Sequence, residues 1–265
     1  MRAFRSEWIK LSRRTMLAGF GGAMVGFAAL ITVLMFLNAG GTSVGPGGGR
    51  TASFASAETL SLADGSVISI THVATFLGII ALALFASNLA GEFARGTIRM
   101  LFVTEPRRIK VLAGKLAALA SFTAAWVAVG LGVSVGLGVL LSSGAGVDTT
   151  AWWTADGFSA MAGTYLSVAG SVIVFGLIGA ALAVLTRSAA IAISAGAAYF
   201  MLVEPLVGSF WGALGEWGPS AVSSALVEGG TAIIGYSTAV VMVAVYGLVG
   251  LVASAVVLSR RDVNS

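Results

Sequence analysis

The chain has 265 residues, of which 57% are hydrophobic and only 10% are charged. Soluble domains usually carry about 25% charged residues, so this composition excludes an ordinary soluble fold. The formal net charge is +4 and there is no cysteine, which excludes a disulfide framework and a thiolate metal site.

Charge-free runs separate the clusters of charged residues along the chain. Most of these runs exceed the roughly 20 residues that a helix needs to cross the hydrocarbon core of a bilayer. The sequence therefore predicts an all-α integral membrane protein with a single transmembrane domain over residues 1–265. The six predicted spans are residues 15–37, 67–90, 116–141, 158–185, 189–210 and 233–258.

The distribution of charge predicts the orientation of the chain. With both termini in the cytoplasm, fourteen of the fifteen Lys and Arg residues fall on one side, and only Arg50 falls on the other. This asymmetry follows the positive-inside rule. A basic protein can also bind nucleic acid, but this distribution favours a lipid bilayer and predicts no nucleic-acid partner. We therefore expect a multi-pass protein of the plasma (inner) membrane.

Residues 1–14 form a short amphipathic segment. Phe4, Trp8 and Leu11 share one helical face, which suits a helix lying on the inner leaflet with its apolar side in the membrane. The alternative is a plain, positively charged start before the first span. The basic residues around the apolar face are Arg5, Lys10, Arg13 and Arg14.

Residues 38–64 are rich in Gly, Ser and Thr and predict a plain outer loop without a folded domain. Gly41 to Gly45 formally match the G-x-S-x-G motif of hydrolases. That motif needs a strand-to-helix elbow and His and Asp partners. The single histidine, His72, falls at the outer start of the second span. We therefore reject a hydrolase and predict no catalytic residue.

Gly91 to Lys115 is the long polar interruption of the chain and carries eight charges. At about 100° per residue, Glu92, Arg95 and Arg99 fall on one side of a helix. Phe93, Thr97 and Met100 fall on the other. We predict a helix over residues 91–103 in the membrane surface, with Glu92 projecting into the cytoplasm; Pro106 lies beyond its end. The alternative is an ordinary basic loop.

The loop at residues 142–157 is short and acidic, and its Trp152 and Trp153 are expected at the outer interface. Later, Glu204-Pro205 and Gly218-Pro219 interrupt an apolar stretch before the last span. Helical hairpins that dip partway into the outer leaflet fit such a stretch, as a re-entrant cap. We expect Glu204, Pro205 and Pro219 to form an outer gate.

The chain lacks a means of powering transport by itself. It has no G-x-x-x-x-G-K-[ST] loop, because Gly114-Lys115 is followed by Leu. No predicted span carries a charged residue at its centre of the kind that ion-coupled transporters use. An energy source on a partner chain is the simplest expectation.

Two segments resemble the permease subunits of type-2 ABC exporters: RSEWIKL near the start, and GEFARGTIRMLFVTEPRRIKVLAGK after the second span. The six-helix layout and the proline-containing segment before the last helix also fit this family. The residues that match the loop pattern are Glu92, Gly96, Thr97, Leu101, Phe102, Pro106, Arg107, Arg108, Gly114 and Lys115.

The resemblance implies that residues 91–103 form a coupling helix in a groove of a cytoplasmic ABC ATPase, flanked by the helix over Phe4 to Leu11. Two such permeases, identical or different, would pair on two ATPase subunits. ATP and Mg would bind the ATPases, and this chain would hold no cofactor or metal and would not be an enzyme. The ATPase-coupling residues would be Glu92, Arg95, Gly96, Thr97, Arg99, Leu101, Pro106 and Arg107.

The expected function is therefore that of an exporter permease moving a hydrophobic or amphipathic substrate. Two alternatives stay open. One is a stand-alone secondary transporter or channel-like protein, and the other is a structural or immunity-type membrane protein without transport activity. The presence of an ATPase partner separates the first hypothesis from both alternatives.

Overall fold

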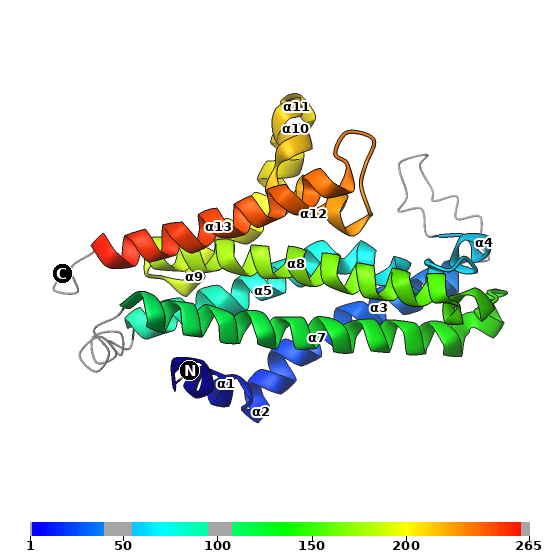
Figure 1. Cartoon of the computed structure of the whole chain (residues 1–265), viewed down its shortest axis with the longest axis horizontal. Coiled ribbons are helices and arrows are strands. Elements are labelled where there is room, and N and C mark those ends of the chain that lie inside the picture. Colours follow the sequence, from blue (N-terminus) through cyan, green and yellow to red (C-terminus); the bar gives the residue numbers. More distant parts are fainter. Residues whose placement is uncertain (1, 40–54, 95–107, 261–265) are drawn as a thin grey trace.

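The computed structural model describes residues 2–39, 55–94 and 108–260. These residues form long helices that lie side by side along one axis, with shorter helices around them (Figure 1). The long helices are α3 (Gly22–Asn38), α5 (Ile68–Ala94), α7 (Arg108–Ala145), α8 (Ala155–Thr186) and α13 (Tyr236–Arg260). No β-strand occurs within the three described ranges.

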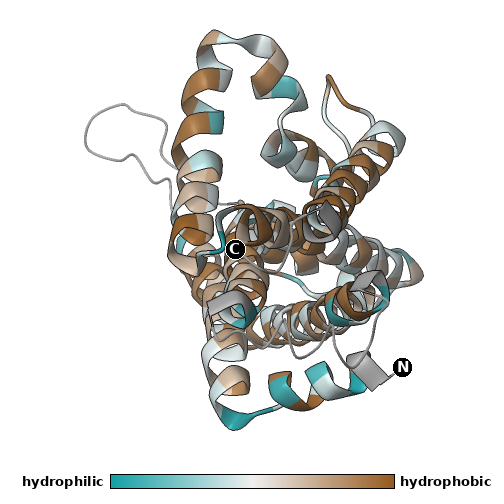
Figure 2. Ribbon diagram, turned by 90° about the vertical axis from the view of Figure 1, so that its left-hand side faces the viewer, coloured by the Kyte–Doolittle hydropathy of each residue, from teal (hydrophilic) through white to brown (hydrophobic). Residues whose placement is uncertain are grey.

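Six helical stretches are long and apolar enough to cross a membrane. The prediction of six apolar helices is thereby confirmed, and hydrophobic residues dominate the bundle (Figure 2). Several stretches extend beyond the predicted ends by a few residues. The stretches are Arg14–Asn38, Gly65–Glu92, Lys110–Ala145, Ala155–Thr186, Ala189–Phe210 and Tyr236–Val257.

The chain enters the bundle through a bent start. Helix α1 (Arg2–Leu11) is followed by the short helix α2 (Arg14–Met16) and a π-helical turn, η1 (Leu17–Gly21), that leads into α3. Teal and brown alternate along α1 in Figure 2, as expected for an amphipathic helix. The predicted interface helix is therefore a separate helix, set at an angle to the first span (Figure 1).

Helices α5 and α8 form the tightest seam of the core. A Cβ atom on Gly78 of α5 would lie 2.8 Å from the Phe175 ring of α8. In the reverse direction, a Cβ on Gly176 of α8 would lie 2.8 Å from the Phe85 ring of α5. Each glycine thus receives an aromatic ring from the other helix, the kind of close approach that small residues allow between membrane helices.

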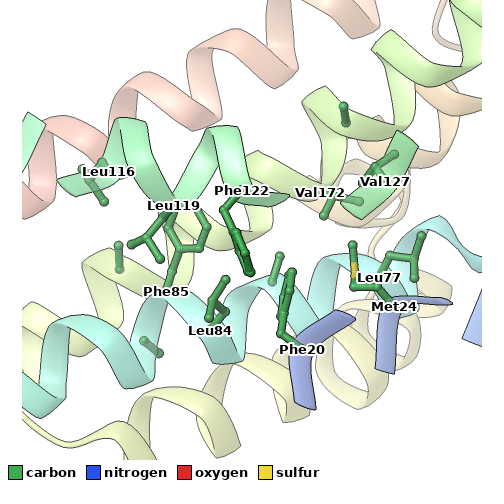
Figure 3. Close-up of a cluster of buried hydrophobic side chains, with 14 of the residues drawn as sticks. Phe20, Met24, Leu77, Leu84, Phe85, Leu116, Leu119, Phe122, Val127 and Val172 are labelled. Carbon is green, nitrogen blue, oxygen red and sulfur yellow. The ribbon is translucent and has the colours of Figure 1, made fainter. Parts of the chain in front are cut away.

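Around this seam, side chains from α3, α5, α7 and α8 fill one continuous hydrophobic cluster. Figure 3 shows that the labelled side chains of this cluster point toward one another from different helices. Those from the first part of the chain and from α7 include Phe20, Met24, Leu116, Leu119, Phe122 and Val127. The core therefore sits between the first four apolar stretches.

The loop between α7 and α8 differs from its prediction. Trp152 is fully buried, and its indole N–H donates to the carbonyl of Leu60 at 2.9 Å. Trp153 is 53% exposed, so only it has the surface position predicted for both. Leu60 ends a short helix, α4 (Ala57–Leu60), so this part of the predicted plain loop is ordered. Trp152 is buried because it packs in a hydrophobic cluster with residues such as Phe36.

The turn between α8 and the next helix, α9 (Ala189–Ala198), falls at Arg187, between the fourth and fifth predicted spans. Arg187 adopts the left-handed conformation, with φ of 55°, which ends α8. The Ser188 side chain then accepts from the N–H of Ile191 and caps α9.

The chain continues as a helix through Glu204-Pro205, so the expected break at this dipeptide is wrong. A π-helical turn, η4 (Tyr199–Val203), joins α9 to α10 (Glu204–Phe210). In this turn the N–H of Glu204 donates to the carbonyl of Tyr199, five residues back. The wider turn adapts the helix to a proline, which lacks an N–H.

Three short helices then connect α9 to α13: α10, α11 (Gly212–Trp217) and α12 (Pro219–Val227). We call residues 204–227 the connecting segment. Each of its helices is shorter than a bilayer span, with 7, 6 and 9 residues. In both overall views α10 and α11 project sideways from the bundle (Figures 1 and 2). No helix of the connecting segment is therefore long enough for a seventh or eighth span, and the cap over a translocation path stays a prediction.

Candidate functional site

Four charged side chains from three helices gather at the end of the bundle where α5 stops and α7 starts. Glu7 and Lys10 lie on α1, Glu92 lies in the last turn of α5, and Lys115 lies near the start of α7. We call these four residues the ion cluster. Its members alternate in charge, and their formal charges cancel.

Each carboxylate of the ion cluster contacts both ammonium groups. Lys10 Nζ lies 2.6 Å from Glu7 Oε1 and 3.7 Å from Glu92 Oε1. Lys115 Nζ lies 3.4 Å from Glu7 Oε2 and donates a hydrogen bond to Glu92 Oε1. The cluster thus joins α1, α5 and α7 through closed contacts, and no helix can leave it without separating opposite charges.

Three members of the ion cluster are withdrawn from solvent. Glu7, Glu92 and Lys115 are 5%, 7% and 4% exposed, whereas the Lys10 side chain is half exposed. Burying charges costs several kcal/mol per ion, roughly, and their mutual attraction often does no more than offset this cost. The cluster as a whole therefore adds little net stability. We assign it a positioning role, because its contacts fix α1, α5 and α7 relative to one another.

The expected exposure of Glu92 is wrong. Helix α5 continues to Ala94, so Glu92 belongs to the end of a long packed helix. Its spacing from Phe85 and Leu89 places it on the buried side of α5, and both of those residues are buried. Glu92 is therefore held by α1 and α7, and its contacts within the chain replace the predicted projection into the cytoplasm.

The apolar face predicted for α1 packs against α7. Leu11 is 1% exposed and belongs to the central core, with Phe4 packed against that core. The Trp8 ring lies edge-on to Phe122 of α7, with 6.2 Å between centroids, and is 36% exposed. All three predicted residues therefore share a face, and protein covers more of that face than expected for a helix lying on lipid alone.

Glu7 and Lys115 were missed as site residues, although the sequence carries a signal for each. Glu7 is three residues after Phe4 and four before Leu11, which puts it on the apolar face of α1. Lys115 stands between apolar residues in VLAGKLAAL. A charged residue in an apolar stripe is costly unless it is paired, so the two positions predict partners of opposite charge.

Most of the predicted ATPase-coupling residues lie outside the described residues. The same holds for the part of the predicted 91–103 helix that follows Ala94. These coupling residues are Arg95, Gly96, Thr97, Arg99, Leu101, Pro106 and Arg107. We call residues 95–107, which follow α5 and precede α7 in sequence, the 95–107 connection. The structure describes the helices on either side of it. Glu92 lies shortly before it and Lys115 shortly after it, and the two are hydrogen-bonded to each other.

A second polar site lies in the connecting segment, at Glu204. This residue is 2% exposed. Its Oε1 atom accepts hydrogen bonds from the N–H groups of Ser220 and Ala221, at 2.8 and 3.2 Å. These donors belong to the first turn of α12, so the carboxylate caps that helix. The structure thereby brings two of the predicted outer-gate residues together, because Pro219 begins the helix that Glu204 caps.

Close backbone contact holds α10 against α11. A Cβ on Gly208 would lie 2.7 Å from Gly215 Cα, and a Cβ on Gly215 would lie 2.7 Å from the carbonyl oxygen of Gly208. The Tyr246 hydroxyl of α13 donates to the carbonyl of Trp217 at the end of α11. The predicted gate residue Pro205 follows Glu204 in the first turn of α10. The connecting segment is therefore tied to itself and to α13.

The six apolar helical stretches define the class of the chain as a multi-pass, all-α membrane protein. A family model described as "Protein of unknown function (DUF2705)" matches residues 27–264, so the chain belongs to this family. A search of curated proteins gave no match.

Proposed function

We propose that the chain is the membrane permease subunit of an ATP-binding cassette exporter in the plasma membrane, powered by a separate ATPase. The observation that carries the proposal is the ion cluster, which joins α1 to both ends of the 95–107 connection. A docking element transmits force only if it stands on a rigid base. The cluster supplies such a base through Glu92 and Lys115, which precede and follow in sequence the stretch that resembles the exporters' coupling helix.

The proposed mechanism moves helices and makes no bonds. Closure of the ATPases around ATP and Mg pushes on the 95–107 connection from the cytoplasm. Because α1, α5 and α7 are linked through the ion cluster, they respond as one body. Helix α5 also packs closely on α8 and α9, and α9 continues into the connecting segment. A shift at the cytoplasmic end is thereby passed to the helices around Glu204 and Pro219, which open the path outward.

The proposed topology places both termini and residues 91–115 in the cytoplasm, and residues 38–64 and 142–157 outside. The lipid bilayer surrounds the six apolar stretches, and a second permease subunit, identical or different, completes the path. Large apolar side chains exposed on α13, including Val241, Leu248 and Val249, support a surface facing lipid or another membrane helix.

Glu204 favours an alternative function. Ion-coupled transporters use carboxylates that are buried among membrane helices, and Glu204 is such a carboxylate. A stand-alone secondary transporter would be driven by an ion gradient without a partner. Transport assays in vesicles, energised either by ATP with the partner or by an ion gradient alone, separate this alternative from the exporter.

The experiment that tests the proposal is reconstitution with an ATPase. The tagged chain is co-expressed with the P-loop ATPase of the neighbouring reading frame, solubilised and purified. We expect the two to co-purify and the complex to hydrolyse ATP faster than the ATPase alone. Arg95→Glu should weaken the complex, whereas Arg13→Glu, a matched charge reversal at an exposed position outside the connection, should leave it intact. A chain that binds no P-loop ATPase contradicts the proposal.

A further inference from the structure

The connecting segment contains a buried oxygen atom without a hydrogen-bond partner. Glu204 Oε1 is satisfied by the two N–H groups of α12. Among the residues that the structure describes, Glu204 Oε2 accepts no hydrogen bond, although it is buried. A buried polar atom without a partner costs about 1 to 3 kcal/mol, and more when it is charged. Such an atom is therefore expected to have a function that offsets this cost.

This oxygen belongs to a residue that lines a partly open cavity of about 460 Å³. The cavity lies between α5, the π-helical turn and the three helices of the connecting segment. Its polar lining residues include Thr75 and Ser224, and its apolar lining residues include Phe200 and Pro205. Gly208 and Gly215 form another side, where the backbones of α10 and α11 touch.

The chemistry of the wall indicates a cationic ligand. In the part of the chain that the structure describes, no Lys, Arg or His lines this cavity. Glu204 Oε1 and Oε2 share one negative charge, which the N-terminus of α12 offsets only in part. An ammonium group in the cavity supplies a full positive charge beside this carboxylate, together with N–H donors. The hydroxyl groups of Thr75 and Ser224 can accept its other N–H bonds.

The size of the cavity favours an organic cation over a metal ion. Small-molecule pockets typically measure about 300 to 1,000 Å³, and this cavity falls in that range. Hard metal ions need six or more oxygen ligands at about 2.0 to 2.6 Å. A wall with one carboxylate and a few hydroxyls does not provide them. Phe200 and Pro205 instead suit the carbon skeleton attached to an amine.

We propose that this cavity binds the primary ammonium group of an amphipathic amine, with the carboxylate of Glu204 as its counter-ion. The binding site is independent of any partner chain. Its identification as a site for the transported substrate rests on the proposed function and narrows the substrate class to amines.

The test measures equilibrium binding of 2-phenylethylammonium to the purified chain in lipid nanodiscs, without any ATPase. The uncharged control ligand is 2-phenylethanol, which has the same ring and chain length. We expect the ammonium compound to bind at least about tenfold more tightly than the alcohol, the factor that one charged hydrogen bond provides. Equal affinity for the two ligands, or no binding of either, overturns the proposal.

Glu204→Gln tests the residue itself. The amide oxygen of glutamine can still accept from Ser220 and Ala221, so α12 keeps its cap while the charge is lost. Binding should weaken by at least about tenfold. Glu216→Gln removes the same charge from α11 of the same segment, outside the residues that line the cavity, and should leave affinity within about twofold. Unchanged affinity in Glu204→Gln, or an equal loss in Glu216→Gln, overturns the assignment.

Two further measurements keep the test decisive. If Glu204→Gln does not fold, Thr75→Val removes a wall hydroxyl without touching the α12 cap, and it should weaken binding of the amine and not of the alcohol. Displacement of the amine by NaCl but not by a second primary amine indicates an inorganic cation site and overturns the proposal. Because no ATPase is present, failure here is distinct from failure of ATPase co-purification, which overturns the proposed function alone.

Discussion

Replacing Lys115 with methionine tests the ion cluster most sharply. The change keeps a long side chain in the same space and removes its ammonium group. Lys115 is 4% exposed and contacts both Glu92 and Glu7. After the change, the two buried carboxylates keep their contacts with the half-exposed ammonium group of Lys10 but lose those with Lys115. The ion cluster then carries a net negative charge in a place that water reaches poorly.

The expected cost follows from this burial. Removing one partner of a buried ion pair destabilises a protein by about 3 to 5 kcal/mol, because the remaining charge stays buried. Removing the charges together is far less costly. The triple variant Glu7→Gln, Glu92→Gln, Lys115→Met should therefore be close to wild type in stability. Lys110→Met provides the matched control, because Lys110 is exposed on the same helix and its loss should change stability by no more than about 0.5 kcal/mol.

The assay is reversible unfolding in mixed micelles with increasing SDS, followed by tryptophan fluorescence and helical circular dichroism. Lys115→Met should shift the transition to clearly lower SDS, and the triple variant should restore most of the shift. The reasoning is refuted if Lys115→Met matches Lys110→Met. It is also refuted if the triple variant is as unstable as Lys115→Met, since uncompensated charge would then not be the cause.

Other predictions concern the connecting segment and the topology. Glu204→Ala leaves two N–H groups of α12 without an acceptor and should cost about 2 to 3 kcal/mol, seen as faster hydrogen exchange over residues 219–227. Gly208→Ala forces α10 away from α11 and should cost about 1 to 3 kcal/mol in thermal unfolding, while Gly212→Ala, whose nearest neighbour would be 3.8 Å away, should have little effect. In intact cells an impermeant thiol reagent should label Gly47→Cys and not Arg95→Cys; the reverse pattern contradicts the proposed orientation.

The six apolar helices could be predicted from the sequence because span length is a strong constraint. A run of about 20 uncharged, apolar residues has few stable arrangements other than a buried or membrane-spanning helix. The prediction needed no knowledge of which helices touch. For that reason it held for spans as different as α3 and α8, while the partners of each helix could not be predicted.

The position of Glu92 shows why local pattern alone was insufficient. The prediction assumed that residues 91–103 form a helix of their own and assigned the two faces on that basis. In the structure α5 runs on to Ala94, so the relevant pattern is that of α5, where Glu92 follows Phe85 and Leu89. The partners Glu7 and Lys115 come from helices distant in sequence, and no local pattern specifies that they meet.

The interfacial position of Trp152 and the helix break at Glu204-Pro205 were mispredicted for a related reason. Trp152 is held by the carbonyl of Leu60, 92 positions away, so its burial depends on a contact outside its own loop. At Glu204 the proline after it suggested a break, but the π-helical turn keeps the helix intact. Such turns are rare and carry no strong sequence signal, and the cap on α12 forms only once the helix has continued.

Crosslinking from the 95–107 connection shows directly whether this chain docks on an ATPase. A photoreactive amino acid is placed at Thr97 in living cells, with Gly47 as the control position. Docking on an ATPase should give a crosslink from position 97, and not from position 47, to a protein that mass spectrometry identifies as a P-loop ATPase. If no position from 95 to 107 crosslinks to a P-loop ATPase while the chain is folded in the membrane, the chain does not dock on an ATPase through this connection.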